Sequence, residues 1–278
     1  MSKTGTAVIE QMNRQQEFRA IFDPTAPPLA WVKYGCPVCG LDFYCTDQEN
    51  DRYGFSVAVA RCECCDLRFL SVHPTAQAYA DFYRSGTYRR LVSAYHGREM
   101  GGCEAEYAWS LGRFLGIGFA IGPGSALPRL DIGGAPDGIF PGAQCTVIDP
   151  ANDGQTAESF DPAGRTWDLI TVCQTADHLL EPGAVFKKLA NCLAPDGVLF
   201  FDVVDFDATQ EYKIDHPCNF NARSAVMLAH VAGLRIDKME RSGNHLRFLC
   251  RHWREAREDK YGIGWCSRAS PETIWIIS

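Results

Sequence analysis

The second half of the chain alternates short apolar runs with amphipathic stretches. Four runs are typical of buried parallel strands, and they lie at 128–132, 144–148, 167–173 and 197–204. Between the last two, LLEPGAVFKKLANCLAPDG has helical periodicity and ends on Pro195, Asp196 and Gly197. This order predicts a βαβ unit and an α/β fold, a doubly wound sheet covered on both faces.

The pattern after residue 220 predicts one more helix and a hairpin. The helix covers ARSAVMLAHVAGL and stops at Gly233. Two alternating runs follow, RIDKMER and NHLRFLCRH, joined by Ser242 and Gly243. The four parallel runs and the two hairpin runs account for six strands of the doubly wound sheet, for which we expect seven in all, one of them an antiparallel edge strand.

The first half is less regular and divides at its prolines. IEQMNRQQEFRAIF fits a helical period loosely, and the prolines at 24, 27 and 28 end it. Cysteine pairs and short β-like runs follow, then two helix-like stretches, PTAQAYADFYRSGTYRRL and CEAEYAWSLGRFLGI. The predicted units are an N-terminal helix and linker (1–30), a ribbon (31–73), a helical bridge or lid (74–125), a cofactor-binding domain (126–252) and a tail (253–278).

Composition narrows the function classes. Among 278 residues, 46% are hydrophobic and 22% charged, values of an ordinary globular protein. The net charge of -7 provides no attraction for a phosphate backbone, so a small molecule is expected as partner rather than nucleic acid. No apolar run is long enough to span a bilayer and the first residues lack a signal-peptide core, so we expect a cytoplasmic protein with no membrane partner.

Six of the thirteen cysteines fall between Cys36 and Cys65. Two C-x-x-C pairs, Cys36 with Cys39 and Cys62 with Cys65, are separated by 22 residues (62 − 39 − 1). Two such turns offer four thiolates to one tetrahedral ion and leave no open coordination position. The spacing predicts a structural Zn²⁺ site, with the nearby Cys45 and Cys64 as bystanders. The alternative is a set of buried or redox-active thiols.

A glycine turn follows the first predicted strand in LDIGGAPDG. Gly133 and Gly134 let the backbone approach a ligand at the carboxyl edge of the sheet. Asp149 lies 18 residues after Asp131, at the end of the next apolar run, where a carboxylate accepts ribose hydroxyls. This combination predicts a nucleoside cofactor site, which a nicotinamide enzyme would share in part.

Several motifs follow one another along the chain: CPVCG and RCECCDLRFL, then LDIGGAPDG, then WDLITVCQTADHLLEP followed by LAPDGVLFFDVV. In these motifs and their order, residues 31–252 resemble the class I S-adenosylmethionine-dependent methyltransferases. More specifically, they resemble bacterial members with an N-terminal zinc-binding module that act on nucleotide sugars, polysaccharides or natural products. The resemblance implies a Rossmann-like sheet. It also implies that Asp131, Gly133 and Gly134 hold the methionine moiety of S-adenosylmethionine.

By the same resemblance, Asp149 holds the ribose, and Gln174 and Thr175 line the site. The chain departs from the family pattern where Ala135, Pro136 and Asp137 interrupt the glycine alternation, and where the first crossover, at 139–142, is short. A short or distorted first helix is therefore expected.

Methyl transfer to oxygen or carbon needs an aligned acceptor and a base. The segment QEYKIDHPCNF lies where related sugar methyltransferases carry a tyrosine- and histidine-rich loop. His216 is the preferred base, oriented by Asp215 or Glu211, and Tyr212 is the second candidate. A loop-anchoring role for His216 is the alternative.

Two further features of the chain stay open. His178 matches the family's histidine before the acidic-proline turn, and either the site or the helix start explains it. The arginines 84, 89 and 90 fit a diphosphate on a nucleotide-sugar acceptor, and they fit a solvated face equally.

The predicted function is thus S-adenosylmethionine-dependent methylation of a hydroxyl or carbon on a nucleotide-sugar, polysaccharide or natural-product acceptor, beside a structural zinc. A catalytically degenerate, methyltransferase-like binding or scaffold protein is the first alternative. A nicotinamide-dependent oxidoreductase is the second. The sequence does not determine the oligomeric state.

Overall fold

The computed structural model describes residues 3–31, 35–99, 114, 128–134, 145–152 and 154–253. Several predictions lie outside these ranges: most of the helix over 103–117, the loop from 135, the short crossover at 139–142, and the tail beyond 253. Within them, no helix combines the length and apolar character that crossing a membrane requires.

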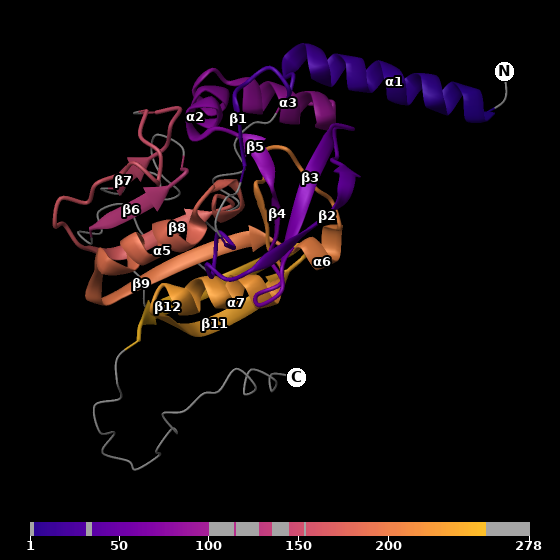
Figure 1. Cartoon of the computed structure of the whole chain (residues 1–278). Helices are drawn as coiled ribbons and strands as arrows, with labels where there is room; N and C mark the ends of the chain where they lie inside the picture. Colours follow the sequence, from indigo (N-terminus) through magenta and orange to yellow (C-terminus); the bar gives the residue numbers. More distant parts are fainter. Residues whose placement is uncertain are drawn as a thin grey trace.

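A six-stranded sheet forms the centre of the C-terminal half (Figure 1). Its strands, in spatial order, are β11 (Leu234–Ser242), β12 (His245–His252), β9 (Leu193–Val204), β8 (Trp167–Cys173), β6 (Arg129–Ile132) and β7 (Cys145–Ile148). Strands β7, β6, β8 and β9 are parallel, while β12 runs antiparallel to both of its neighbours. The predicted antiparallel strand is therefore present, but its predicted position at the edge is wrong, because β12 lies one position inside the edge.

The prediction of seven strands is also wrong for the described part of the chain, where this sheet has six. Residues 154–166 pass from β7 toward β8 through turns and bends, so β7 remains at the edge. Strand β9 begins at Leu193, earlier than predicted, and the segment 195–197 belongs to it rather than to the preceding helix. A register shift between Trp167 and Leu169 accommodates the extra residues, which bulge between the paired positions Leu193 and Val198.

Both faces of the sheet are covered, because neighbouring strand residues point to opposite sides. Phe201 packs edge-on against Phe186 of α5 (Pro182–Asn191), with ring centroids 5.1 Å apart. Phe200 points the other way and packs edge-on against Phe114, at 5.5 Å. Helix α7 (Ala222–Val231) contacts α5 and β11, and Figure 1 shows both helices in front of the sheet. The predicted α/β class is confirmed.

The N-terminal half has two smaller sheets and three described helices. Their elements are α1 (Lys3–Ile21), β1 (Leu29–Trp31), β2 (Phe43–Asn50), β3 (Ser56–Cys62), β4 (Arg68–Leu70), β5 (Val72–Pro74), α2 (Ala76–Arg84) and α3 (Thr87–His96). Strands β1 and β5 form a two-stranded sheet. The predicted helix after Pro74 is broken at Gly86, a left-handed residue (φ 70°) between α2 and α3.

The ribbon sheet is not closed within residues 31–73. Its order is β10-β4-β3-β2, and β10 (Cys218–Asn219) comes from the loop after β9. Cys218 pairs with Phe69, and the backbone N–H of Leu70 donates to the carbonyl of Pro217 at 2.9 Å. One continuous hydrophobic core contains ribbon and large-sheet residues together. The two predicted units therefore share both a sheet and a core.

Candidate functional site

The carboxyl ends of β6, β7 and β8 bring the predicted cofactor residues to one edge of the sheet. Gly133 follows β6 with φ 79°, and its N–H donates to the carbonyl of Ile148 at 2.8 Å. A Cβ atom at Gly133 would lie 2.2 Å from Oγ1 of Thr175. The position therefore requires glycine on two grounds, its left-handed backbone and the side chain that lies across it.

Asp131 lies beneath this loop, with only 1% of its surface exposed. Its carboxylate accepts a hydrogen bond from the hydroxyl of Thr171 at 2.6 Å. A Cβ on Gly134 would lie 2.0 Å from Oδ2 of Asp131. The side chain of Asp131 thus supports the glycine loop from below.

Asp149 follows β7 and is half-buried. Its Oδ1 accepts from the N–H of Ala151 at 2.7 Å, which folds the following turn. From that turn, Nδ2 of Asn152 donates to the carbonyl of Gly134 at 3.1 Å. Asn152, which the sequence did not single out, therefore joins the predicted ribose acid to the glycine loop. No motif marks it, because the contact depends on how β6 and β7 are paired.

Gln174 and Thr175 follow β8 at the same edge. Gln174 is exposed and adopts a left-handed backbone (φ 49°), and its N–H donates to Oδ1 of Asp202 at 2.8 Å. Thr175 donates from Oγ1 to the carbonyl of Cys173 at 2.9 Å. Asp202, fully buried in β9, is a second residue that sequence reasoning missed. It looks like a strand residue in the sequence, and only the pairing of β8 with β9 brings it under this turn.

The loop between β7 and β8 is held by an aromatic contact and by a lysine of α5. Phe160 is buried, with its ring 5.9 Å from that of Trp167. Nζ of Lys188 donates to the carbonyls of Ala157, Glu158 and Phe160 at 3.2, 2.7 and 2.9 Å. Phe160 is thus a core residue, and Lys188 of α5 fixes this loop beside the cofactor edge.

A buried histidine cluster lies beyond β8 and β9. His178, in the short helix η1 (Ala176–His178), and His216 have ring centroids 4.4 Å apart. Nδ1 of His216 lies 2.9 Å from Oδ2 of Asp177, and Nε2 lies 3.5 Å from Oδ2 of Asp215. His216 is 6% exposed, Asp177 1% and Asp215 2%. The imidazole of His216 is therefore bracketed by two buried carboxylates.

Burial and the neighbouring side chains shift the pKa values of Asp177 and His178 in this cluster. Burial acts to raise the pKa of Asp177, but the adjacent His216 outweighs it, so the pKa lies well below its usual range. Burial, and then the nearby His216, lower the pKa of His178. The cluster therefore keeps Asp177 as a carboxylate and favours His178 in its neutral form.

Tyr83 of α2 connects the N-terminal helices to this cluster. Its hydroxyl lies 2.8 Å from Nδ1 of His178. The same nitrogen lies 2.7 Å from the carbonyl of Asp215. Tyr79 instead donates to the carbonyl of Ile214 at 2.7 Å, and Phe82 packs within the aromatic core. Tyr88 of α3 also packs against His178, with ring centroids 5.5 Å apart, so tyrosines of both helices contact this predicted site residue.

Two further predicted residues, Tyr212 and Arg84, have other neighbours. Tyr212 is half-buried, with its ring 4.9 Å from that of Phe206, and burial raises the pKa of its hydroxyl. The contacts described for Tyr212 do not include the two histidines. Arg84 is exposed and pairs with Asp81 at 2.8 Å.

The four predicted metal ligands converge. Their sulfur atoms all lie within 4.8 Å of one another, and Cys36 with Cys65 and Cys39 with Cys62 approach to 3.5 Å. A hydrogen bond from Cys65 lowers the pKa of Cys36 to about 6, whereas burial raises the pKa of Cys39 to about 12. Four sulfur atoms this close together, three of them on buried residues, can all be thiolates only if a cation compensates their charge, and this donor set fits Zn²⁺.

The comparisons with known proteins agree with this geometry. The sequence model of a methyltransferase domain matches residues 120–261, just over half of the chain. The chain belongs to this methyltransferase family. The match confirms the prediction of an enzyme of the S-adenosylmethionine-dependent methyltransferase class. No curated protein matches the chain.

Several solved structures share part of the fold. A SAM-dependent methyltransferase from Leishmania major has 17% identity over 62% of this chain and 81% of its own, with a TM-score of 0.47. An S-adenosylmethionine-dependent methyltransferase from Clostridium acetobutylicum has 12% identity over 60% of this chain and 97% of its own, with a TM-score of 0.42. At these values, neither likeness bears on the reaction.

Proposed function

We propose that this methyltransferase transfers a methyl group to a hydroxyl oxygen or carbon of a small acceptor, a nucleotide sugar, polysaccharide or natural product. The observation that carries the proposal is the histidine cluster at the carboxyl edge of the sheet. His178 comes after β8 and His216 after β9, and their ring centroids are 4.4 Å apart. An oxygen or carbon acceptor must lose a proton during methylation, and an imidazole beside a carboxylate is suited to take it.

The cofactor side of the site is assigned to the glycine loop and its neighbours. When bound, S-adenosylmethionine supplies a methyl group on a positively charged sulfur. In the proposal, the loop at Gly133 and Gly134 accommodates the methionine moiety, supported by Asp131. Asp149 accepts hydrogen bonds from the ribose, and Gln174 and Thr175 line the methyl side.

On the acceptor side, the proposed base is His216. The carboxylate of Asp177 lies 2.9 Å from Nδ1 and orients the ring, and its charge stabilises the imidazolium after proton transfer. Bound S-adenosylmethionine would supply the methyl group to the acceptor atom, and His216 would take the proton that the acceptor loses. Tyr212 stays the second candidate for proton transfer. Arg84, on α2, stays a candidate for contact with an acceptor diphosphate.

A structural zinc ion is the second part of the proposal. Cys36, Cys39, Cys62 and Cys65 supply four thiolates and no open position, so the ion would hold the fold rather than react. The convergence of the four sulfur atoms, three of them on buried residues, supports this assignment. Metal analysis of purified protein tests it, with one zinc per chain as the expected result and a metal-free, fully folded chain as the contrary one.

Calorimetry with S-adenosylhomocysteine is the first test of the cofactor site. We expect one binding site per chain, and no heat at millimolar ligand would contradict the assignment. Selective binding of NADH would instead favour an oxidoreductase.

Methyl-labelled S-adenosylmethionine with panels of nucleotide sugars, polysaccharides and natural products then tests the reaction. The expected result is labelling that His216→Asn abolishes without weakening S-adenosylhomocysteine binding. Cofactor binding with no labelled product in any panel, and coelution with another protein, would favour the scaffold alternative.

A further inference from the structure

The two C-x-x-C turns have the same backbone bonding but differ at their fifth residue. In the first, the N–H of Gly40 donates to the carbonyl of Cys36 at 2.8 Å, and Gly40 has φ 73°. In the second, the N–H of Asp66 donates to the carbonyl of Cys62 at 3.1 Å, and Asp66 has φ 63°. Left-handed backbone favours glycine, so the turn itself does not call for a side chain at residue 66.

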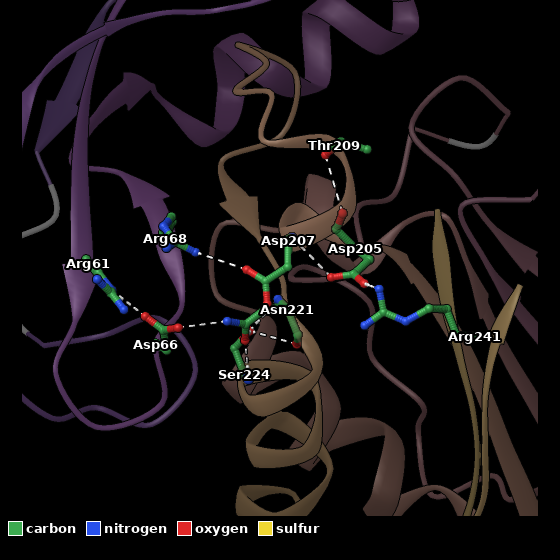
Figure 2. A network of polar contacts seen from close by, with 9 residues as sticks. All are labelled: Arg61, Asp66, Arg68, Asp205, Asp207, Thr209, Asn221, Ser224 and Arg241. Atoms are coloured by element: carbon green, nitrogen blue, oxygen red, sulfur yellow. Dashed lines mark hydrogen bonds and ion pairs between the residues drawn. The ribbon is translucent and has the colours of Figure 1, made fainter. Parts of the chain in front are cut away.

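The side chain of Asp66 makes contacts outside the turn, as Figure 2 shows. Its Oδ1 accepts from Arg61, and its Oδ2 accepts from Nδ2 of Asn221 at 2.8 Å. Asn221 caps α7 with its other amide atom, since Oδ1 accepts from the N–H of Ser224 at 3.0 Å. One residue of the cysteine turn is therefore bonded directly to the beginning of a helix in the methyltransferase domain.

The segment between His216 and Asn221 is held against the same ribbon. Leu70 donates its N–H to the carbonyl of Pro217 at 2.9 Å, and Cys218 pairs with Phe69. Nδ2 of Asn219 donates to the carbonyl of His216 at 3.3 Å. Residues 213–221 are all buried, which leaves little freedom to shift independently of the ribbon.

We propose that Asp66 is a positioning residue: through Asn221 it couples the geometry of the cysteine turn to the position of His216. The proposal rests on the catalytic role proposed for His216. A metal ion that fixes Cys62 and Cys65 also fixes Asp66, which lies next to Cys65 in the chain. The zinc ribbon would then act on methyl transfer by holding the base in place, although no cysteine contacts the acceptor.

Asp66→Gly separates this role from the stability of the turn. Glycine suits the backbone at this position, as Gly40 does in the first turn, so the zinc content should not change. Asp66→Asn keeps an acceptor for Asn221 and tolerates the left-handed backbone. Asn221→Ser keeps the helix cap but loses the reach to Asp66, and serves as a second disrupting variant. Asp207→Asn is the matched control, because Asp207 pairs with Arg68 of the ribbon at 3.6 Å from an exposed position.

The primary measurement is the NMR spectrum of the histidine side chains in zinc-loaded, ¹⁵N-histidine-labelled protein, with the His216 signals assigned by His216→Asn. We expect Asp66→Gly and Asn221→Ser to move these signals, Asp66→Asn to restore them largely, and Asp207→Asn to leave them in place. With an acceptor from the labelling panels, kcat should fall at least about tenfold in Asp66→Gly, since small misplacements of a reacting group cost that much. The affinity for S-adenosylhomocysteine should stay unchanged.

Unmoved His216 signals in both disrupting variants would overturn the proposal, as would an equal displacement in Asp207→Asn. If the signals move as expected but the wild-type chain methylates nothing in any panel, the proposed reaction fails while the coupling of Asp66 to His216 stands. If the signals move and kcat is unaffected, His216 is not the base that this coupling positions, and the proposal is overturned.

Discussion

Replacing Gly133 by alanine tests the packing of the cofactor loop. The new Cβ would lie 2.2 Å from Oγ1, 2.6 Å from Cγ2 and 2.9 Å from Cβ of Thr175, so no rotation of the threonine side chain removes the overlap. The left-handed backbone costs an alanine about 1–2 kcal/mol. Overpacking adds about 1–3 kcal/mol. The free energy of unfolding should therefore fall by about 2–5 kcal/mol.

Gly243→Ala is the matched control, because Gly243 has φ 62° in the β11–β12 turn and nothing lies within 4 Å of its Cβ position. It should lose only the backbone contribution, about 1–2 kcal/mol. In a chain of this size each kcal/mol corresponds to about 2–4 °C of melting temperature, so thermal unfolding resolves the two variants. Calorimetry should also show that Gly133→Ala weakens S-adenosylhomocysteine binding at least about tenfold, which Gly243→Ala should not do.

Thr175→Ala added to Gly133→Ala removes the two closest atoms and should recover part of the lost stability. Wild type, Gly133→Ala, Thr175→Ala and the double variant form a double-mutant cycle in which the overlap appears as a coupling between residues 133 and 175. Equal melting temperatures for Gly133→Ala and Gly243→Ala, with no recovery on adding Thr175→Ala, would show that the loop is not packed as described.

Three further predictions concern charge and metal. Burial raises the pKa of Asp51 to about 7, so the stability that its protonated form contributes is full below about pH 4 and is lost as the pH rises toward 7. Urea unfolding should show that the wild type loses on the order of 3–4 kcal/mol of unfolding free energy relative to Asp51→Asn across that range. Parallel pH profiles of the two proteins would refute this. Asp177→Asn should slow methyl transfer about a hundredfold at unchanged cofactor affinity, measured by initial rates, and an unchanged rate would remove Asp177 from the mechanism. Cys62→Ser should abolish stoichiometric zinc and lower the melting temperature, whereas Cys64→Ser should do neither; zinc loss in both would reassign the ligands.

Local patterns in the sequence were sufficient for the elements that carry strong periodicity. The runs ending at Ile132, Ile148, Cys173 and Val204 became β6, β7, β8 and β9, and the final hairpin became β11 and β12. Burial on both faces makes such strands almost uniformly apolar, and an apolar run can be recognised in the sequence without knowing the tertiary structure. The cysteine spacing likewise predicted which four sulfur atoms would converge, because each C-x-x-C turn is local.

The ends of the strands and the number of strands were predicted less well, because both depend on which strands lie next to one another in the sheet. The segment 195–197 has the composition of a helix end, yet it lies within β9, between the positions Leu193 and Val198 that pair with β8. The seventh expected strand had no apolar run of its own in the sequence, and the segment 154–166 consists of turns and bends.

The sequence by itself thus determined the fold class, the methyltransferase family and the residues that follow each parallel strand, because hydrophobic period and turn chemistry are local properties. Only the tertiary structure decided which distant groups meet. It placed Asp177 against His216, Tyr83 against His178 and Asp66 against Asn221, and it completed the ribbon sheet with Cys218 and Asn219. These contacts join residues 39 to 155 positions apart, and their geometry is set by how sheets and helices pack, which no short pattern encodes.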